Sequence, residues 1–256
     1  MDRYQRVARV IFAIGLIGMG VLGLAFGDFA MQWQPVPAGL PWRADLAYFC
    51  AALELLTGLA LLVPRLASIA SRVGVVYAAL WWVLLKIPVV VAAPLTEVSW
   101  LGLGEIAVIL AGAWTLYLSY GRAEPSAKGL RQPAILFGLA LIPIGLSHIF
   151  YTTATASLVP AWLPFHRGLA YCTGAAQVAA GLGVLFSVVP ALAATLEATA
   201  LSIFTIAVWL PGVFGAHAGR LPWTALTMSS MITAGAWVVA ASVASRHRAQ
   251  HLEAAP

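Results

Sequence analysis

Apolar residues occupy the chain in eight long runs, and polar or helix-breaking residues separate these runs. Each run is close to the roughly 20 residues that an α-helix needs to cross the hydrocarbon core of a bilayer. The breaks are rich in Pro, Gly, Arg and Ser, a composition typical of loops. The sequence therefore predicts an all-α, polytopic membrane protein with transmembrane helices at 7–27, 44–63, 70–93, 98–119, 133–151, 167–188, 192–214 and 222–244.

One proline-containing phrase occurs twice along this pattern. VPAGLPW at 36–42 returns as VPAWLPF at 159–165, which is 123 positions further on. The same shift places AGAW at 111–114 on AGAW at 234–237. A register that is kept over so long a stretch indicates an internal duplication.

The duplication predicts two tandem four-helix bundles. Because each unit has an even number of helices, both units point the same way, and a pseudo-twofold axis along the membrane normal relates them. We expect a first unit at 1–122, a cytoplasmic linker at 123–132, and a second unit with a short cytoplasmic tail at 133–256.

Composition supports a membrane protein and argues against a nucleic-acid-binding one. The chain is 62% hydrophobic and 9% charged, whereas about a quarter of a soluble domain is charged. The net charge of +5 comes from basic residues clustered between the apolar runs. With the N-terminus inside, the inner segments hold ten Lys and Arg residues and the outer segments three. This bias predicts a bacterial inner-membrane protein, solvated by lipid, with both termini in the cytoplasm.

The second helix carries a family resemblance. In AALELLTGLALLVPRLAS at 51–68, Glu54 is followed by Gly58, a Leu-rich stretch and a basic turn. This pattern resembles the DoxX/DoxD family of four-helix membrane proteins, and the likeness extends over both halves, although Gln177 replaces the glutamate in the second. Some members of that family resemble the membrane subunit of thiosulfate:quinone oxidoreductase, and others accompany oxidoreductase partners. The resemblance therefore implies a quinone-linked role.

Ionisable side chains inside a bilayer are costly, so each one is a functional candidate. Glu54, Lys86 and Glu105 lie within predicted helices of the first half, and Trp82 could wall a ring beside them. Together they predict a quinone pocket, because a quinone head group needs hydrogen-bonding groups and a proton donor. The alternative is a buried ion pair that locks helix packing. The corresponding residues of the second half are Gln177, Trp209 and Met228. We therefore expect intramembrane ionisable groups in the first half only.

Three histidines form a second candidate set. We expect His148, His166 and His217 near the outer face, where they could bind Zn, Cu or haem. Their spacing matches no metal motif, and a polar rim is the alternative. The chain has neither a phosphate-binding glycine loop nor a CxxC pair. We therefore expect no intrinsic haem, flavin or iron–sulfur cluster, and assign such cofactors to a partner subunit.

These observations favour a membrane subunit of a quinone-linked redox complex that anchors partner subunits. A non-catalytic accessory subunit packed around a larger membrane complex is the alternative. A small-molecule carrier working between the two repeats is a third possibility.

Overall fold

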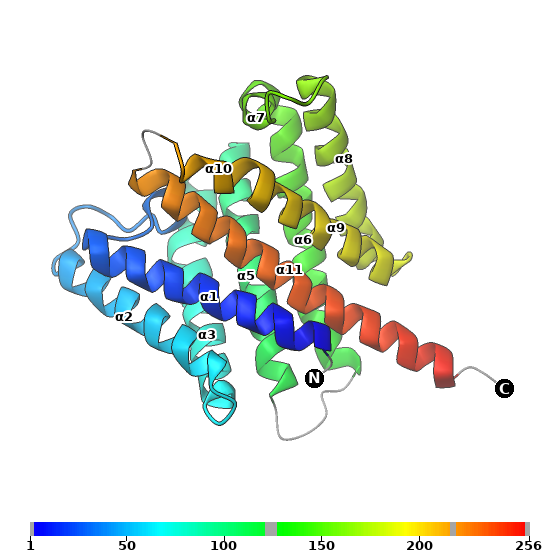
Figure 1. Cartoon of the computed structure of the whole chain (residues 1–256), viewed down its shortest axis with the longest axis horizontal. Coiled ribbons are helices and arrows are strands. Elements are labelled where there is room, and N and C mark those ends of the chain that lie inside the picture. Colours follow the sequence, from blue (N-terminus) through cyan, green and yellow to red (C-terminus); the bar gives the residue numbers. More distant parts are fainter. Residues whose placement is uncertain (1–2, 121–126, 216–218, 254–256) are drawn as a thin grey trace.

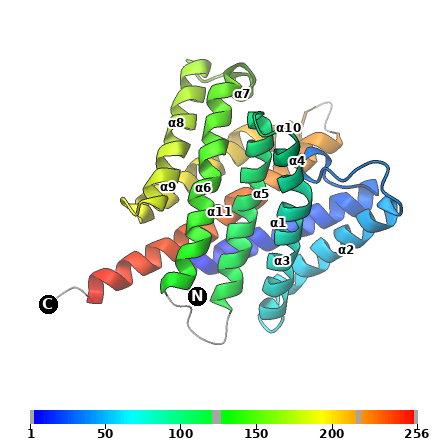
Figure 2. The ribbon, with the colours of Figure 1, turned by 180° about the vertical axis from the view of Figure 1, so that it is seen from behind.

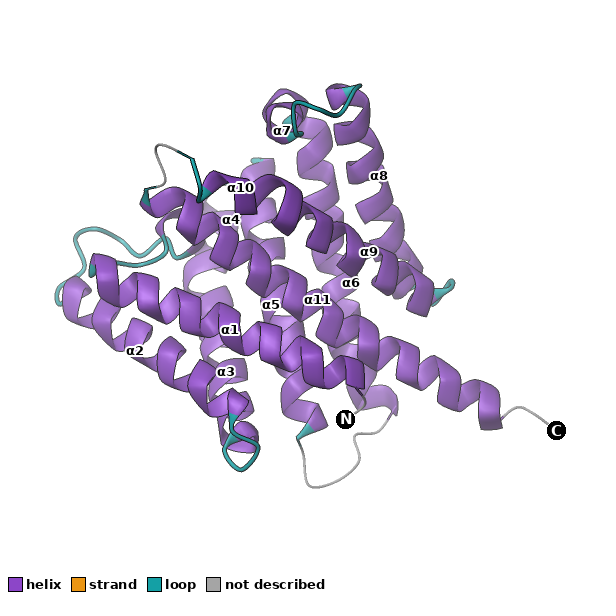
Figure 3. Ribbon diagram, in the orientation of Figure 1, coloured by secondary structure: helices purple, strands orange, loops and turns teal. Residues whose placement is uncertain are grey.

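The computed structural model describes residues 3–120, 127–215 and 219–253, which form helices joined by loops (Figure 1). Within this part of the chain, eight helices are long and apolar enough to cross a membrane, which confirms the predicted all-α polytopic fold. The helical elements (Figure 3) are α1 (Arg3–Phe26), η1 (Met31–Trp33), α2 (Arg43–Leu62), α3 (Ala67–Trp81), η2 (Trp82–Lys86), α4 (Ile87–Ala92), α5 (Glu97–Ser119), α6 (Ala127–Phe150), α7 (Thr152–Leu158), α8 (His166–Leu185), α9 (Pro190–Phe204), η3 (Thr205–Trp209), α10 (Leu210–Gly212) and α11 (Arg220–Glu253).

The long helices pack in two layers. In one layer α1 lies between α2 and α11, and α9 packs against the other side of α11. In the second layer α5 and α6 lie side by side, flanked by α3 and α8 respectively. Figures 1 and 2, which view the molecule from opposite sides, show the two layers crossing at a clear angle. Each layer therefore combines helices from both halves of the chain, so the halves are interlaced.

The layers touch most closely where α5 crosses α11. A Cβ atom added to Gly112 would lie 2.5 Å from the Cα of Gly235, and one added to Gly235 would lie 2.8 Å from the carbonyl oxygen of Val108. Side chains cannot fit between these backbones. In lipid the hydrophobic effect does not drive helices together, so their association depends on close van der Waals packing. Small residues at a crossing allow that packing.

Matching elements in the two halves lie 123 positions apart. The bounds of α8, α9 and η3 are those of α2, α3 and η2 moved by this distance. The residues that precede α2 and α8, Trp42 and Phe165, both have a positive φ, 61° and 57°. This agreement makes position-by-position comparison of the halves meaningful.

Two π-helical turns occur at matching places, η2 and η3. In them the backbone N–H groups of Ile87 and Leu210 donate to carbonyls five residues back, at Trp82 and Thr205. A proline follows each donor, Pro88 and Pro211. Because proline has no N–H and crowds the carbonyl four residues before it, a wider turn lets the helix continue past it. The predicted third and seventh helices therefore bend without breaking.

Candidate functional site

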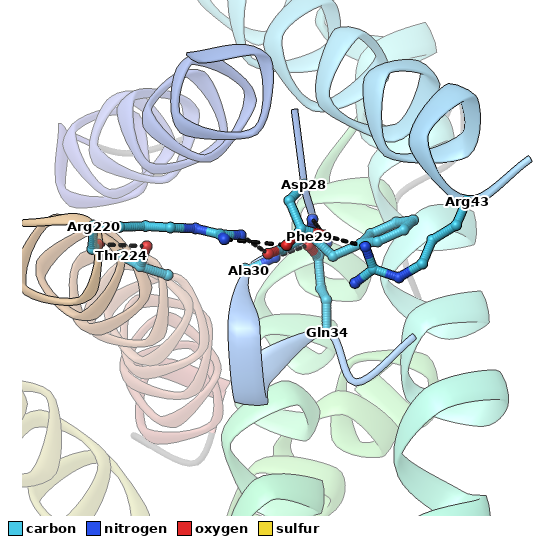
Figure 4. A network of polar contacts seen from close by, with 7 residues as sticks. All are labelled: Asp28, Phe29, Ala30, Gln34, Arg43, Arg220 and Thr224. Carbon is cyan, nitrogen blue, oxygen red and sulfur yellow. Dashed lines mark hydrogen bonds and ion pairs between the residues drawn. The ribbon is translucent and has the colours of Figure 1, made fainter. Parts of the chain in front are cut away.

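The segment after α1 turns back into the helix bundle. Phe29, Ala30, Trp33 and Gln34 are buried, and Figure 4 shows the chain between Asp28 and Gln34 surrounded by helices. We call residues 28–34 the buried loop. A loop in an apolar interior needs partners for its backbone polar groups, and the surrounding helices provide them.

Glu54 on α2 lies against this loop and is 3% exposed. Its Oε1 accepts a hydrogen bond from the Tyr77 hydroxyl of α3 at 2.7 Å and another from Nε2 of Gln34 at 2.9 Å. The Oε1 atom of Gln34 accepts the backbone N–H of Ala30 at 2.8 Å. This network ties the buried loop to α2 and α3, and it gives the intramembrane carboxyl group two donors.

Two further side chains hold the backbone of the loop. Lys86 Nζ donates to the carbonyl oxygen of Gln32 at 2.9 Å, and the Trp81 indole N–H donates to the carbonyl oxygen of Trp33 at 2.7 Å. Glu105 on α5 interacts electrostatically with Lys86 and accepts a hydrogen bond from the side chain of Trp33. Lys86 therefore donates to a carbonyl oxygen of the loop and is also attracted by the carboxyl group of Glu105.

Glu54, Lys86 and Glu105 thus surround one structural feature, the buried loop, which occupies the space between them. The ion pairs within the described residues are those of Asp28. Lys86 and Glu105 attract each other without the direct contact expected of a locking ion pair. Trp82 lines a different space, a groove beside α5.

That groove runs between α5 and α6 and has a volume of about 950 Å³. Its aromatic walls include Trp82, Trp100, Phe150 and Tyr151, and its other walls are largely apolar. Phe150 is 68% exposed, so this α5–α6 groove faces the lipid. The Trp82 indole N–H donates to the carbonyl oxygen of Leu103 at 3.1 Å, which fixes the ring as one wall.

Glu97, the first residue of α5, also lines the α5–α6 groove. Both of its carboxyl oxygens are buried and have no hydrogen-bond partner among the described residues. Glu97 also interacts electrostatically with Glu105. A buried carboxyl group without a partner is costly, so this groove presents an unmet polar group to any molecule that enters from the lipid.

Asp28, Arg43 and Arg220 form an ion cluster at the end of the bundle opposite the termini. Arg43 Nη1 lies 2.5 Å from Asp28 Oδ1, and Arg220 Nη1 lies 3.1 Å from Asp28 Oδ2 (Figure 4). Arg220 also donates to the carbonyl oxygen of Phe29. Burial would raise the pKa of Asp28, but the hydrogen bonds from the Phe29 N–H, Arg43 and Arg220 outweigh it, and the pKa is lowered from 3.8.

A small cavity connects the ion cluster with Glu54. Its volume is about 10 Å³, and Asp28, Arg220, Cys50 and Glu54 are among its lining residues. That is about the space of a single water molecule. The cavity is therefore too small for a quinone ring, which makes the α5–α6 groove the better candidate site for a quinone.

The histidines do not assemble into a metal centre within the part of the chain described here. His148 Nδ1 lies 2.9 Å from Thr173 Oγ1, and the His148 ring packs against Phe204. His166 begins α8, and His217 lies outside the described residues. No group of three His, Cys, Asp or Glu side chains that could hold a metal ion occurs among the described residues.

The second half contains a buried carboxyl group, contrary to the expectation from sequence. Glu197 on α9 is 2% exposed, and its Oε1 accepts a hydrogen bond from Nε2 of Gln177 on α8 at 3.1 Å. The expectation failed because it compared only the three positions occupied by Glu54, Lys86 and Glu105. This carboxyl group lies on α9 and not on α8, and the residue 123 positions before it in the first half is Gly74.

No protein-family model, curated protein or solved structure matches this chain. The site therefore has to be understood from its own geometry. Sequence reasoning missed Glu97, Glu197, Tyr77 and Gln34. A signal existed for Glu197, a carboxylate inside an apolar run, and for Glu97 at the start of one. Gln34 gave none, because it is an ordinary polar residue in the segment between two predicted helices.

Proposed function

We propose that this protein is a membrane subunit of a quinone-linked redox complex and that a quinone head group binds in the α5–α6 groove. The observation that carries the proposal is Glu97, a buried carboxyl group without a described partner in a lipid-facing, aromatic-walled groove. A quinone enters from lipid, and its carbonyl oxygens need hydrogen-bond donors. Protonated Glu97 would supply one beside the ring walls formed by Trp82 and Trp100.

Reduction of the bound quinone requires a source of electrons outside this chain. Reduction of a quinone to a quinol consumes two electrons and two protons, and the electrons would come from a redox-active partner subunit. Protons would reach the quinone oxygens through Glu97. Glu105 interacts electrostatically with both Glu97 and Lys86, so it is the next group toward the interior. In this proposal Glu54 holds the buried loop and does not touch the quinone.

We also propose how the chain arose and how it is oriented in the membrane. We infer that a four-helix ancestor was duplicated in tandem, and the matching bounds of α2 and α8, α3 and α9, and η2 and η3 support this. We propose that both termini lie on the cytoplasmic side of the membrane, which the even number of spans and the distribution of basic residues support. The resemblance to the DoxX/DoxD family remains a hypothesis that agrees with the redox role.

The second candidate function is that of a non-catalytic accessory subunit. Trp42, Trp162 and Phe165 are 81%, 77% and 84% exposed at the end of the bundle opposite the termini. Such rings suit a partner surface as well as the headgroup zone of a bilayer. A subunit that only packs around a larger complex would use these surfaces and leave the α5–α6 groove filled with lipid.

Quinone binding tests the first function directly. The purified chain in nanodiscs should bind a benzoquinone with a decyl tail, and Glu97→Met, which removes the donor at similar length, should weaken binding about tenfold, the loss expected for one strong buried hydrogen bond. Trp82→Leu should also weaken it, whereas Trp223→Leu, at an exposed tryptophan outside the groove, should not. Equal affinities in all variants would reject this groove.

Extraction from native membranes in mild detergent separates the two functions. Partner subunits together with bound quinone support the redox subunit. Partner subunits without quinone, combined with no decylquinone binding by the purified chain, support the accessory subunit.

A further inference from the structure

A second groove lies between α8 and α9, two helices that do not line the α5–α6 groove. Its volume is about 430 Å³, and its walls are mostly small or aliphatic residues with Phe204 at one end. Gln177 and Glu197 are its polar lining residues at depth. Leu192 and Leu196, which also line it, are 56% and 59% exposed, so this α8–α9 groove is open to lipid.

The polar groups of this groove have an unmet hydrogen bond. Gln177 is 1% exposed and uses its Nε2 to donate to Glu197. Its Oε1 is buried and has no hydrogen-bond partner among the described residues. A lipid chain in the groove would leave that oxygen unsatisfied, whereas a molecule with a hydroxyl donor would satisfy it.

In the first half, protein side chains donate the hydrogen bonds that the α8–α9 groove lacks. There Tyr77 and Gln34 donate to Glu54, so a phenol and an amide satisfy the buried carboxyl group. The residue 123 positions after Tyr77 is Ala200, which lines the α8–α9 groove. The position matching Gln34 is Ser157 on α7, and its hydroxyl donates to the carbonyl oxygen of Ala154. The second half therefore has the polar acceptors and lacks the phenol.

We propose that the α8–α9 groove binds an amphipathic phenol taken from the lipid phase. Its hydroxyl donates to the Gln177–Glu197 pair, as the Tyr77 hydroxyl donates to Glu54. Its ring lies over Ala200, in the space that the tyrosine side chain occupies in the first half, and its apolar tail extends past Leu192 and Leu196 into lipid. This inference does not depend on the redox function, because it concerns binding in a different groove.

Matched ligands test the role of the hydroxyl. The purified full chain in nanodiscs is titrated with 4-octylphenol and with 4-octylanisole, its methyl ether, which keeps the ring and tail but cannot donate. We expect the phenol to bind about tenfold more tightly or better, the ratio that corresponds to one buried hydrogen bond. Equal affinities would overturn the proposal and assign the groove to lipid chains.

Substitutions of residues that line the groove test where the phenol binds. Ala200→Tyr should place a phenol in the groove and abolish 4-octylphenol binding, while Ala200→Ser should retain it. The double variant Gln177→Met with Glu197→Met removes both polar acceptors of the groove at similar length, so it should reduce the preference for the phenol over the ether to about one. This variant decides the question if Ala200→Tyr fails to fold. Glu54→Gln, in the other half, should leave phenol binding unchanged. Unaltered binding in Ala200→Tyr and in the double variant would reject the site.

Discussion

The Tyr77 hydroxyl lies 2.7 Å from Oε1 of Glu54 and donates a hydrogen bond to it, across the interface between α3 and α2. Gln34 of the buried loop donates to the same oxygen. A carboxyl group within the bilayer thus organises two helices and a loop. Its first role is structural, and the groups that the α5–α6 groove offers to a ligand lie elsewhere.

Removing the tyrosine hydroxyl should destabilise the protein. Tyr77→Phe keeps the ring but leaves the Glu54 carboxyl group with one donor fewer, which should cost about 1–3 kcal/mol of unfolding free energy. Thermal unfolding in a mild detergent would measure this loss. Tyr171→Phe is the control, because Tyr171 is 50% exposed and its loss should change little. Equal melting temperatures for the two variants would contradict a structural role for the Tyr77 bond.

Loss of the Lys86 ammonium group should loosen the buried loop. Lys86→Met removes the donor to the Gln32 carbonyl oxygen and leaves Glu105 without its positive neighbour. Hydrogen exchange of the backbone amides around residues 29–34 should become faster by an order of magnitude, roughly the effect of losing one strong local hydrogen bond. Leu84→Met changes an exposed residue of the same turn and should leave exchange unaltered. Unchanged protection in Lys86→Met would mean that the other contacts of the loop, from Trp81, Glu54 and Arg220, hold it without Lys86.

The Asp28 ion cluster should stabilise the protein in a pH-dependent way. Because the folded-state pKa of Asp28 lies below 3.8, its contribution is present above that value and is lost as the pH falls through the folded pKa. The stability difference between the wild type and Asp28→Asn should therefore be full near pH 6 and shrink below about pH 4. Melting temperatures over this range would measure it. A difference independent of pH would show that the charge of Asp28 contributes nothing.

Glycine should be required where α5 crosses α11. In Gly112→Ala the new Cβ meets backbone atoms of Gly235, which cannot move aside as a side chain can. Overpacking of this kind costs about 1–3 kcal/mol or more, so the melting temperature should fall clearly. Gly39→Ala is a matched control, because nothing lies within 4 Å of the Cβ that it would add. A tolerated Gly112→Ala would show that the helices can separate without loss.

The sequence by itself determined the fold class and the number of spans. Apolar runs long enough to cross a bilayer must become helices, because a helix satisfies its own backbone hydrogen bonds in lipid. The repeated phrase also located the matching loops before α2 and α8. Pro88 and Pro211 lie 123 positions apart in the sequence, but the π-turns that let the helices continue past them depend on local hydrogen bonds that only the structure describes.

The tertiary structure decided which polar groups share a site. Gln34 and Glu54 are 20 positions apart, and Asp28 and Arg220 are 192 positions apart, and no periodicity predicts that they touch. The buried loop and the placement of Lys86 arise only when several helices surround the same segment. Hydrophobic patterning specifies which residues enter the membrane because transfer into lipid depends on each residue's own chemistry. Which buried polar groups pair depends on how the helices pack in three dimensions.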